Sequence, residues 1–413
     1  MPYLHFSKFN PTHPSIGRKP RRMKSAPILL ILLSACILRL PAQQLTAPAE
    51  RSQGEFLGRS APASEWAAAP QRSGKSKRRR IIPKEIPNFT QRQRIPRLAA
   101  ATAAPRGADP LYSPGRYRTN ERVIEPALTF DGIDMPTAGD VLPPDPCGDL
   151  NGAHFVQMTN ASGGGMLRAY GLQGNLAFEL ASLNSLWAQF GVMGLGDPIV
   201  LWDHAANRWM ISEFQDFSGN ALLVAISASE DPTGEWLAYR FETPSFPDYP
   251  KYSVWHNAYL VTTNEPGDPN IPVYALERQA MLEGEAPGVQ RLGIPKFSEG
   301  SFQVATPVDW DGSTPPPAGA PGYVVRLYDD AWEGGQDKVE LWEVYIDWEV
   351  DDNNLISGPM DMVGAPFDTE ICPNGSFFDC IEQPNGQRVD GLQDIILHRV
   401  PYLNFGNHES ILV

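Results

Sequence analysis

The stretch GDPIVLWDHAANRWMISEF, residues 196–214, contains two apolar runs separated by a polar break. The first run, 198–203, is short and rich in β-branched residues, and residues 204–207 interrupt it. Residues 208–214 then resume with a near alternation of polar and apolar positions. Two such runs around a short polar break are typical of a β-hairpin.

This hairpin belongs to a repeat. Similar runs begin at Asp145-Pro146, Asp197-Pro198 and Tyr249-Pro250, and their prolines stand 52 residues apart. The second copy continues with strand-like runs at 221–227 and 236–241, which gives four strands per unit. Looser copies begin at Thr306-Pro307 and in the C-terminal run 392–413. Four strands in a period near 50 residues predict an all-β fold, a β-propeller of four-stranded antiparallel blades with about five blade units.

Charge divides the chain into two parts. Residues 1–122 carry 23 Lys and Arg against 6 Asp and Glu, whereas residues 123–413 carry 11 against 42. An acidic folded part argues against nucleic acid as a partner, because such binding relies on basic side chains that displace counterions. We therefore expect no nucleic-acid surface on the propeller.

The N-terminus has the pattern of a secretory signal, and we assign residues 1–42 to it, with Met23 as an alternative start. A basic stretch precedes the apolar run 26–38, which is too short for a confident membrane span. Cleavage after Ala42 would release an extracellular protein. The alternative, a lipobox ending at Cys36, would leave a lipidated cell-surface or outer-membrane protein. In both cases no membrane span remains after processing.

Residues 43–120 are rich in Pro, Ala, Ser and Arg, contain the basic run 74–84 and show little periodicity. We interpret them as a disordered basic linker, and we assign 121–413 to the propeller. Cys372 and Cys380 enclose a short loop of turn-forming residues, and export favours a disulfide between them. Zinc is the alternative, although no histidine pair lies nearby to complete a site.

The blocks PPDPCGDLNGAHFVQMTN, GDPIVLWDHAANRWMISEF, PSFPDYPKYSVWHNAYLVTTN and RVPYLNFGNHESILV resemble those of a group of secreted bacterial β-propeller proteins. The resemblance covers about residues 140–413 and implies a propeller fold and export. It implies no activity or catalytic residues, since these proteins are mostly uncharacterised. They usually continue through further blades after the NHES block. The sequence therefore looks truncated after Val413, or it closes with fewer blades.

Candidate site residues follow from their positions in the repeat. His154, His204 and His256 fall near the same point of successive copies, where they could ring the axis or simply occupy turns. In DPCGDLNG, the oxygen-bearing residues Asp145, Asp149 and Asn151 suggest a calcium loop, because calcium prefers several oxygen ligands. The alternative there is a tight turn that enters the first blade. Calcium is the one cofactor that the sequence suggests.

Aromatic and acidic side chains supply two further hypotheses. Trp332 lies in the turn-like run DDAWEGGQDK and is the best candidate for an exposed sugar-stacking ring. A glycosidase would instead need two carboxyl groups near the axis. The acids considered for that role are Asp203, Glu213, Asp248, Asp309 and Asp330.

The favoured function is binding or adhesion to an extracellular glycan or protein by a monomeric propeller, and enzymatic activity is left open but less favoured. The alternative is a secreted carbohydrate-active hydrolase or lyase that uses carboxylates at the propeller axis. A third class is a structural module displayed within a larger surface protein. The fold alone cannot decide among them, since propellers serve all three.

Overall fold

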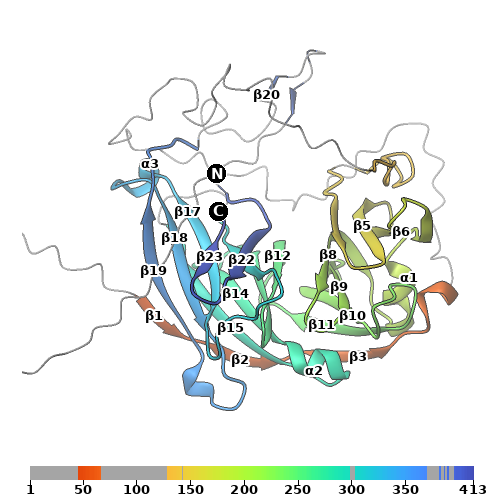
Figure 1. Ribbon diagram of the computed structural model, residues 1–413, viewed down its shortest axis with the longest axis horizontal. Helices are drawn as coiled ribbons and strands as arrows, with labels where there is room; N and C mark the ends of the chain where they lie inside the picture. Colours follow the sequence, from red (N-terminus) through yellow and green to blue (C-terminus); the bar gives the residue numbers. More distant parts are fainter. Residues whose placement is uncertain are drawn as a thin grey trace, which may run out of the picture.

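The structure is a computed structural model, and it describes residues 45–66, 128–141, 143–297, 303–369, 381–382, 386, 388–389 and 395–413. These residues fold mainly into antiparallel sheets that stand side by side (Figure 1). The predicted signal segment, most of the predicted linker, and Cys36, Cys372 and Cys380 lie outside the described residues. The expectations about export, lipidation and the disulfide therefore stay predictions.

Four consecutive units each form a four-stranded meander, and we number them blades 1 to 4. Blade 1 contains β4 (Cys147–Leu150), β5 (His154–Ala161), β6 (Gly164–Gly171) and β7 (Leu176–Leu180). Blade 2 contains β8 (Gly194–Asp203), β9 (Arg208–Gln215), β10 (Ala221–Ser227) and β11 (Trp236–Glu242). Blade 3 contains β12 (Asp248–Val254), β13 (Ala258–Asn264), β14 (Asn270–Glu277) and β15 (Gly288–Pro295). Blade 4 contains β16 (Thr306–Trp310), β17 (Gly322–Tyr328), β18 (Lys338–Tyr345) and β19 (Leu355–Val363).

The predicted β-propeller of four-stranded blades is confirmed. The opening hairpin of blade 2 is β8–β9, with Asp203 opposite Arg208, and the predicted strands at 221–227 and 236–241 are β10 and β11. The first strand of each blade lies innermost. Pro198 and Pro250 lie inside the inner strands β8 and β12, at points where the pairing with the next strand shifts register. Proline suits such a position because it has no N–H to donate, and within sheets it is confined to edge strands, first residues and bulges.

The core consists of layers between neighbouring blades. Leu222, Val224 and Ile226 of β10 pack towards blade 3, whereas Leu223 and Ala225 pack towards blade 1. Both faces of this sheet are therefore buried, and all seven residues of β10 are inaccessible. Burial on both faces explains why the strand is a continuous apolar run rather than an alternating one. A third layer joins blades 3 and 4.

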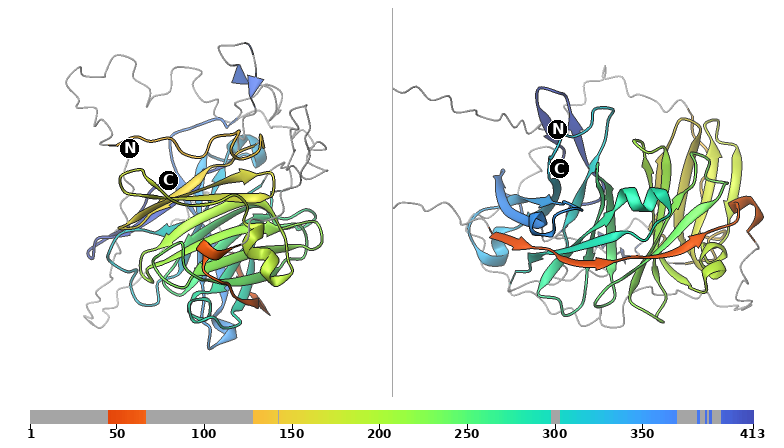
Figure 2. Two further views of the ribbon diagram at one scale, coloured as in Figure 1. Left: turned by 90° about the vertical axis from the view of Figure 1, so that its right-hand side faces the viewer. Right: turned by 90° about the horizontal axis from the view of Figure 1, so that it is seen from below.

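A strap of three short strands crosses the outer edges of three blades, as the red ribbon in Figure 2 shows. It contains β1 (Leu45–Pro48), β2 (Glu50–Gln53) and β3 (Glu55–Arg59). These strands pair antiparallel with β19, β15 and β11, respectively, and each adds a fifth strand to a blade. The prediction of a disordered linker from residue 43 is therefore wrong for residues 45–59, because their backbone groups complete the sheet edges.

A fifth unit follows blade 4. Its strands are β22 (Val400–Asn404) and β23 (Glu409–Ile411), which form a hairpin. β22 pairs in parallel with the inner strand β16, so the hairpin begins next to the axis. The fifth copy predicted from the C-terminal run is confirmed to this extent.

Short elements complete the described chain. They are the strand pair β20 (Ile381–Glu382) and β21 (Arg388–Val389), the helices α1 (Asn184–Trp187), α2 (Arg278–Glu283) and α3 (Asp330–Glu333), and 3-10 turns at Ala63–Glu65, Ala188–Phe190 and Asp351–Asn353. None of the described helices has the length and hydropathy of a membrane span.

Candidate functional site

An unusual backbone conformation recurs next to the repeated prolines of three blades. Asp145, Asp197 and Tyr249, the residues before the three equally spaced prolines, have φ angles of 40°, 51° and 54°. Positive φ is uncommon outside glycine, and such strain persists only where the surroundings impose it. Its recurrence in three successive blades places three polar side chains at the same end of the axis, which we call the axis mouth.

An asparagine of blade 1 brings two of these carboxylates together. The Nδ2 of Asn160, which is fully buried, donates to Asp145 Oδ2 at 2.9 Å and to Asp197 Oδ1 at 3.3 Å. Its Oδ1 in turn accepts the backbone N–H of Asp197 at 2.8 Å. Because one nitrogen binds both acids, the two oxygens lie no more than about 6 Å apart, close to the separation found in glycosidases.

Lys251 of blade 3 completes this group. Its ammonium lies 3.5 Å from the centre of the Tyr249 ring and donates to the Pro250 carbonyl at 3.1 Å. Burial lowers the pKa of Lys251, and the negative charges of Asp197, Asp145 and Asp248 oppose that effect. We call Asp145, Asp197, Asp248, Tyr249 and Lys251 the axis cluster, in which three carboxylates surround one cation.

An exposed aromatic ring and its stacking partner lie close to the axis cluster. Phe217, in the loop between β9 and β10, is 72% exposed and stacks on Phe246 with ring centres 6.0 Å apart. Phe246 packs edge-on against Phe214, which pairs with Gly196 next to Asp197. The Phe246 carbonyl also accepts the N–H of Asp248. This aromatic pair therefore lies close to Asp197 and Asp248 of the axis cluster.

Deeper in the axis, Arg399 joins three acids. Its guanidinium lies 3.0 Å from Asp149, 3.2 Å from Asp309 and 3.3 Å from Asp311. Burial raises the pKa of Asp309 to about 7, and Asp311 and Asp149 add to the effect, whereas Arg399 and the Val254 N–H oppose it. Asp149 comes from blade 1 and Asp309 from blade 4, so this network connects blade 1 with blade 4.

The three predicted histidines take separate roles. His154 begins β5, and the His204 ring packs edge-on against Trp310 at 4.7 Å. The Nε2 of His256 lies 3.2 Å from the Ala320 carbonyl. Within the described ranges, no histidine belongs to a group of side chains close enough to share a metal ion. The structure therefore does not bring the three rings together as a ligand set.

The predicted calcium ligands also point to different partners. Asp145 binds Asn160, and Asp149 accepts the N–H of Trp202 and the Arg399 guanidinium. Asn151 accepts two backbone N–H groups within its own turn, from Ala153 and His154. These contacts are those of the tight-turn alternative. Calcium binding at this loop stays a prediction that the geometry does not support.

Among the described residues, one acidic group has the spacing of a metal site, namely Asp329, Asp330 and Asp337 in blade 4. Asp329 accepts from the N–H of Ala331 and from Thr369, whereas Asp337 accepts from the N–H groups of Asp330 and Phe367. Protein donors thus occupy oxygens of two of the three acids. We interpret this group as the cap of helix α3.

Two other candidate acids are structural. Asp203 receives two bonds from Arg278, at 2.6 and 2.8 Å, and one from the Tyr259 hydroxyl at 2.8 Å. Glu213 receives the Trp187 indole N–H at 2.6 Å and the Gly165 N–H at 2.9 Å. Each is fully buried, so both acids hold blades together rather than face a substrate.

The expectation that Trp332 is exposed is wrong, since the side chain is only 6% exposed. The turn-like sequence around it forms the short helix α3, with Asp329 as its cap. The helix directs the indole inward, where its ring centre lies 5.4 Å from that of Phe297 and 6.3 Å from that of Tyr328. Phe217, in the loop between β9 and β10, is instead an exposed aromatic ring.

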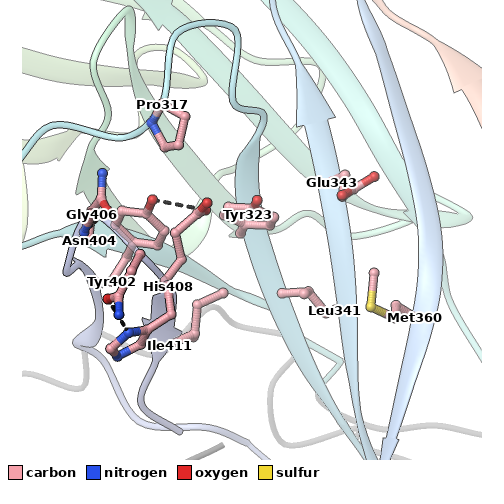
Figure 3. A pocket seen from close by; sticks show the side chains of 12 residues that line it. Pro317, Tyr323, Leu341, Glu343, Met360, Tyr402, Asn404, Gly406, His408 and Ile411 are labelled. Atoms are coloured by element: carbon pink, nitrogen blue, oxygen red, sulfur yellow. Dashed lines mark hydrogen bonds between the residues drawn. The ribbon is translucent and has the colours of Figure 1, made fainter. Parts of the chain in front are cut away.

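A cavity of about 420 Å³ lies at the other end of the molecule, between blade 4 and the β22–β23 hairpin (Figure 3). Its position follows from the topology, because the turns after the inner strands β16 and β22 form its rim. Its lining combines aromatic, acidic, amide and apolar side chains: Pro317, Tyr323, Leu341, Glu343, Met360, Tyr402, Asn404, Asn407, His408, Glu409 and Ile411. We call it the hairpin pocket.

No protein-family model and no curated protein matches this chain. Among solved structures, it is similar to a family 43 β-1,3-galactosidase (11% identity, TM-score 0.29), covering 52% of this chain and 44% of that one. An α-L-arabinofuranosidase from Clostridium thermocellum matches with 12% identity and a TM-score of 0.30, covering 65% and 80%. A thermostable family 43 glycoside hydrolase matches with 10% identity and a TM-score of 0.21, covering 54% and 95%.

The class of the protein rests on its own geometry. Successive four-stranded meanders, each with its first strand at the axis, define a β-propeller. Polar side chains from several blades meet at that axis. The chain spans less than half of the galactosidase that it resembles. The candidate sites on this propeller are therefore the axis cluster, the aromatic pair and the hairpin pocket.

Proposed function

We propose that this propeller binds a neutral extracellular polysaccharide at the axis mouth. The observation that carries the proposal is the exposed Phe217 ring, which stacks on the partly buried Phe246 next to Asp248 of the axis cluster. Aromatic faces stack on the apolar faces of sugar rings, and carboxylates accept hydrogen bonds from their hydroxyl groups. The strongly acidic folded part would repel anionic polymers, which favours a neutral glycan.

The experiment titrates the protein with soluble xylan, galactomannan and a soluble cellulose derivative in a calorimeter. We expect Phe217→Ala to lower the affinity for the bound glycan about tenfold, which corresponds to the loss of one stacking contact. Phe405→Ala is the matched control, because Phe405 is also exposed but lies on the turn of the β22–β23 hairpin. Equal weakening by both substitutions, or no saturable binding by the unaltered protein, would contradict the proposal.

A second function, glycoside hydrolysis, is favoured by one observation. Asn160 holds Asp145 and Asp197 within about 6 Å of one another, a separation compatible with an acid and a base or nucleophile. If the site cleaves its ligand, the unaltered protein should release reducing ends from the glycan that it binds. Asp197→Asn should then reduce that release at least a hundredfold while binding persists. Binding without product in both proteins supports the binding function alone.

A further inference from the structure

The hairpin pocket carries an unusual distribution of charge. Glu343 of β18 and Glu409 of β23 both line it, and both side chains are half-buried. Each accepts one tyrosine hydroxyl, Glu343 from Tyr345 at 2.8 Å and Glu409 from Tyr402 at 3.0 Å. In the described part of the chain, no Lys or Arg forms an ion pair with either acid. Within the described residues, these two carboxylates therefore share one cavity with no Lys or Arg paired to either of them.

Tyr323 lies between these two acids. It is the cross-strand partner of Glu343, and its ring stands 6.2 Å from that of Tyr402 with 21° between the planes. Burial raises the pKa of Tyr323, and the negative charges of Glu409 and Glu343 raise it further. The phenol therefore stays neutral and cannot offset the charge of the acids. Figure 3 shows its ring between the hairpin and the strand that carries Glu343.

Partly buried negative charge is costly unless a cation compensates it. Aromatic faces attract cations electrostatically, and they attract organic ammonium groups in particular. The remaining wall, formed by Leu341, Met360 and Ile411, is apolar and suits the alkyl part of such a ligand. We propose that the hairpin pocket binds an organic ammonium cation, with its charge near Glu343 and Glu409 and its alkyl groups against the tyrosine rings.

Other occupants fit less well. A divalent metal would need more oxygen ligands, and the two acids are not among the side chains that converge at metal-binding distance in the described ranges. A neutral sugar could stack on the tyrosines, but it would leave both negative charges uncompensated. The site lies at the opposite end from the axis mouth, so this inference does not depend on the proposed function.

The test is a calorimetric titration of the intact chain with tetramethylammonium and with choline. The neutral isostere 3,3-dimethylbutan-1-ol serves as the comparison ligand. We expect both cations to bind at least tenfold more tightly than the isostere, and affinity to fall as salt concentration rises. Glu343→Gln and Glu409→Gln should each weaken cation binding at least fivefold. Glu349→Gln is the matched control, since Glu349 is exposed and lies outside the pocket.

Several results would overturn the inference. Equal binding of the isostere would show an apolar site, and displacement of the cations by millimolar calcium would show an inorganic cation site. Tight binding of a sugar, or of an added β-strand peptide along β23, would assign a different occupant. Near-ultraviolet circular dichroism of each variant checks that the fold persists. Tyr323→Leu provides a second route, because it removes a ring without altering charge and should also weaken cation binding.

Discussion

At the scale of single residues, the axis contains titratable side chains that are less easily ionised than in water, because they are buried. His398 is mostly buried, and its Nε2 lies 2.7 Å from the Tyr252 carbonyl. Burial and the nearby Lys251 lower the pKa of His398 from 6.5 to about 4, although the bond to Tyr252 opposes this. Asp309 shifts the other way, with a pKa raised to about 7. Both groups are therefore most compatible with the fold when neutral.

These shifts predict opposite pH dependences. Neutral His398 contributes to the free energy of unfolding above pH 6.5, and this contribution, at most about 3 kcal/mol, is lost as the pH falls towards 4. His398→Gln keeps a donor for the Tyr252 carbonyl, and in this variant the free energy of unfolding should no longer fall between pH 6.5 and 4 for this reason. Urea unfolding measured between pH 4 and 8 provides the test, and an unchanged decline would contradict it.

For Asp309, the folded state prefers the protonated acid, so stability is present below pH 3.8 and is lost as pH rises through about 7. Asp309→Asn keeps an acceptor for the Val254 N–H, which the acid binds at 2.7 Å. The variant should lose less stability than the unaltered protein between pH 4 and 8. The same urea series measures both variants. If His398→Gln and Asp309→Asn changed the pH dependence of the free energy of unfolding in the same direction, the opposite pKa shifts of the two groups would be refuted.

At the scale of elements, the strap determines how the blades are held at their outer edges. Gly54 lies between β2 and β3, and its N–H donates to the Pro287 carbonyl at 2.8 Å. A Cβ at this position would lie 2.4 Å from the Phe241 ring, whose side chain is buried. The strap therefore packs too closely against blade 2 to accept a side chain there.

This close approach makes a testable pair of substitutions. Gly54→Ala should lower the free energy of unfolding by about 1–3 kcal/mol, because the buried Phe241 cannot move without strain. Gly152→Ala is the control, since nothing lies within 4 Å of a Cβ at that position. The control should change stability by less than about 0.5 kcal/mol. Thermal unfolding compares them, and equal effects would show that the strap is not tightly packed.

At the scale of the whole molecule, Arg399 connects blades 1 and 4, which are far apart in the sequence. The residue precedes β22, and its guanidinium contacts Asp149 of blade 1 and Asp309 of blade 4. A propeller leaves open sheet edges if its first and last units do not meet, and such edges favour aggregation. The network is therefore a connection across the axis rather than a local surface pair.

Removing this cation should destabilise the assembled blades. Arg399→Met leaves three acids without their shared cation. We expect the free energy of unfolding to fall by about 1–3 kcal/mol, a moderate effect because the Arg399 side chain is about one third exposed and partly screened by solvent. Arg51→Met is the matched control, because its pair with Asp351 is more than half exposed on both sides. The control should change stability by less than about 1 kcal/mol. Denaturant unfolding distinguishes the two, and an Arg399→Met variant of unchanged stability would contradict a role for Arg399 in holding blades 1 and 4 together.

Much of the candidate site could not be predicted from the sequence. The repeated prolines located the axis mouth, and Asp145 and Asp248 were considered, although for other roles. Asp197 and Lys251 were not singled out, and Phe217 carried no signal, since an exposed aromatic residue in a loop resembles a buried one in a sequence. Trp332 was misjudged because charged and glycine neighbours suggested solvent, whereas helix α3 turns its ring inward.

The sequence by itself determined the strands, the four-stranded unit and its repetition. Strands buried on both faces need continuous apolar runs, and proline within these inner strands is accommodated where the register shifts, so both features can be read from the local sequence. Only the tertiary structure decided which side chains meet. The axis cluster and the Arg399 network join residues from different blades, and the strap pairs with strands more than 170 residues away. Such contacts depend on how the blades are arranged in space, which no local pattern of residues records.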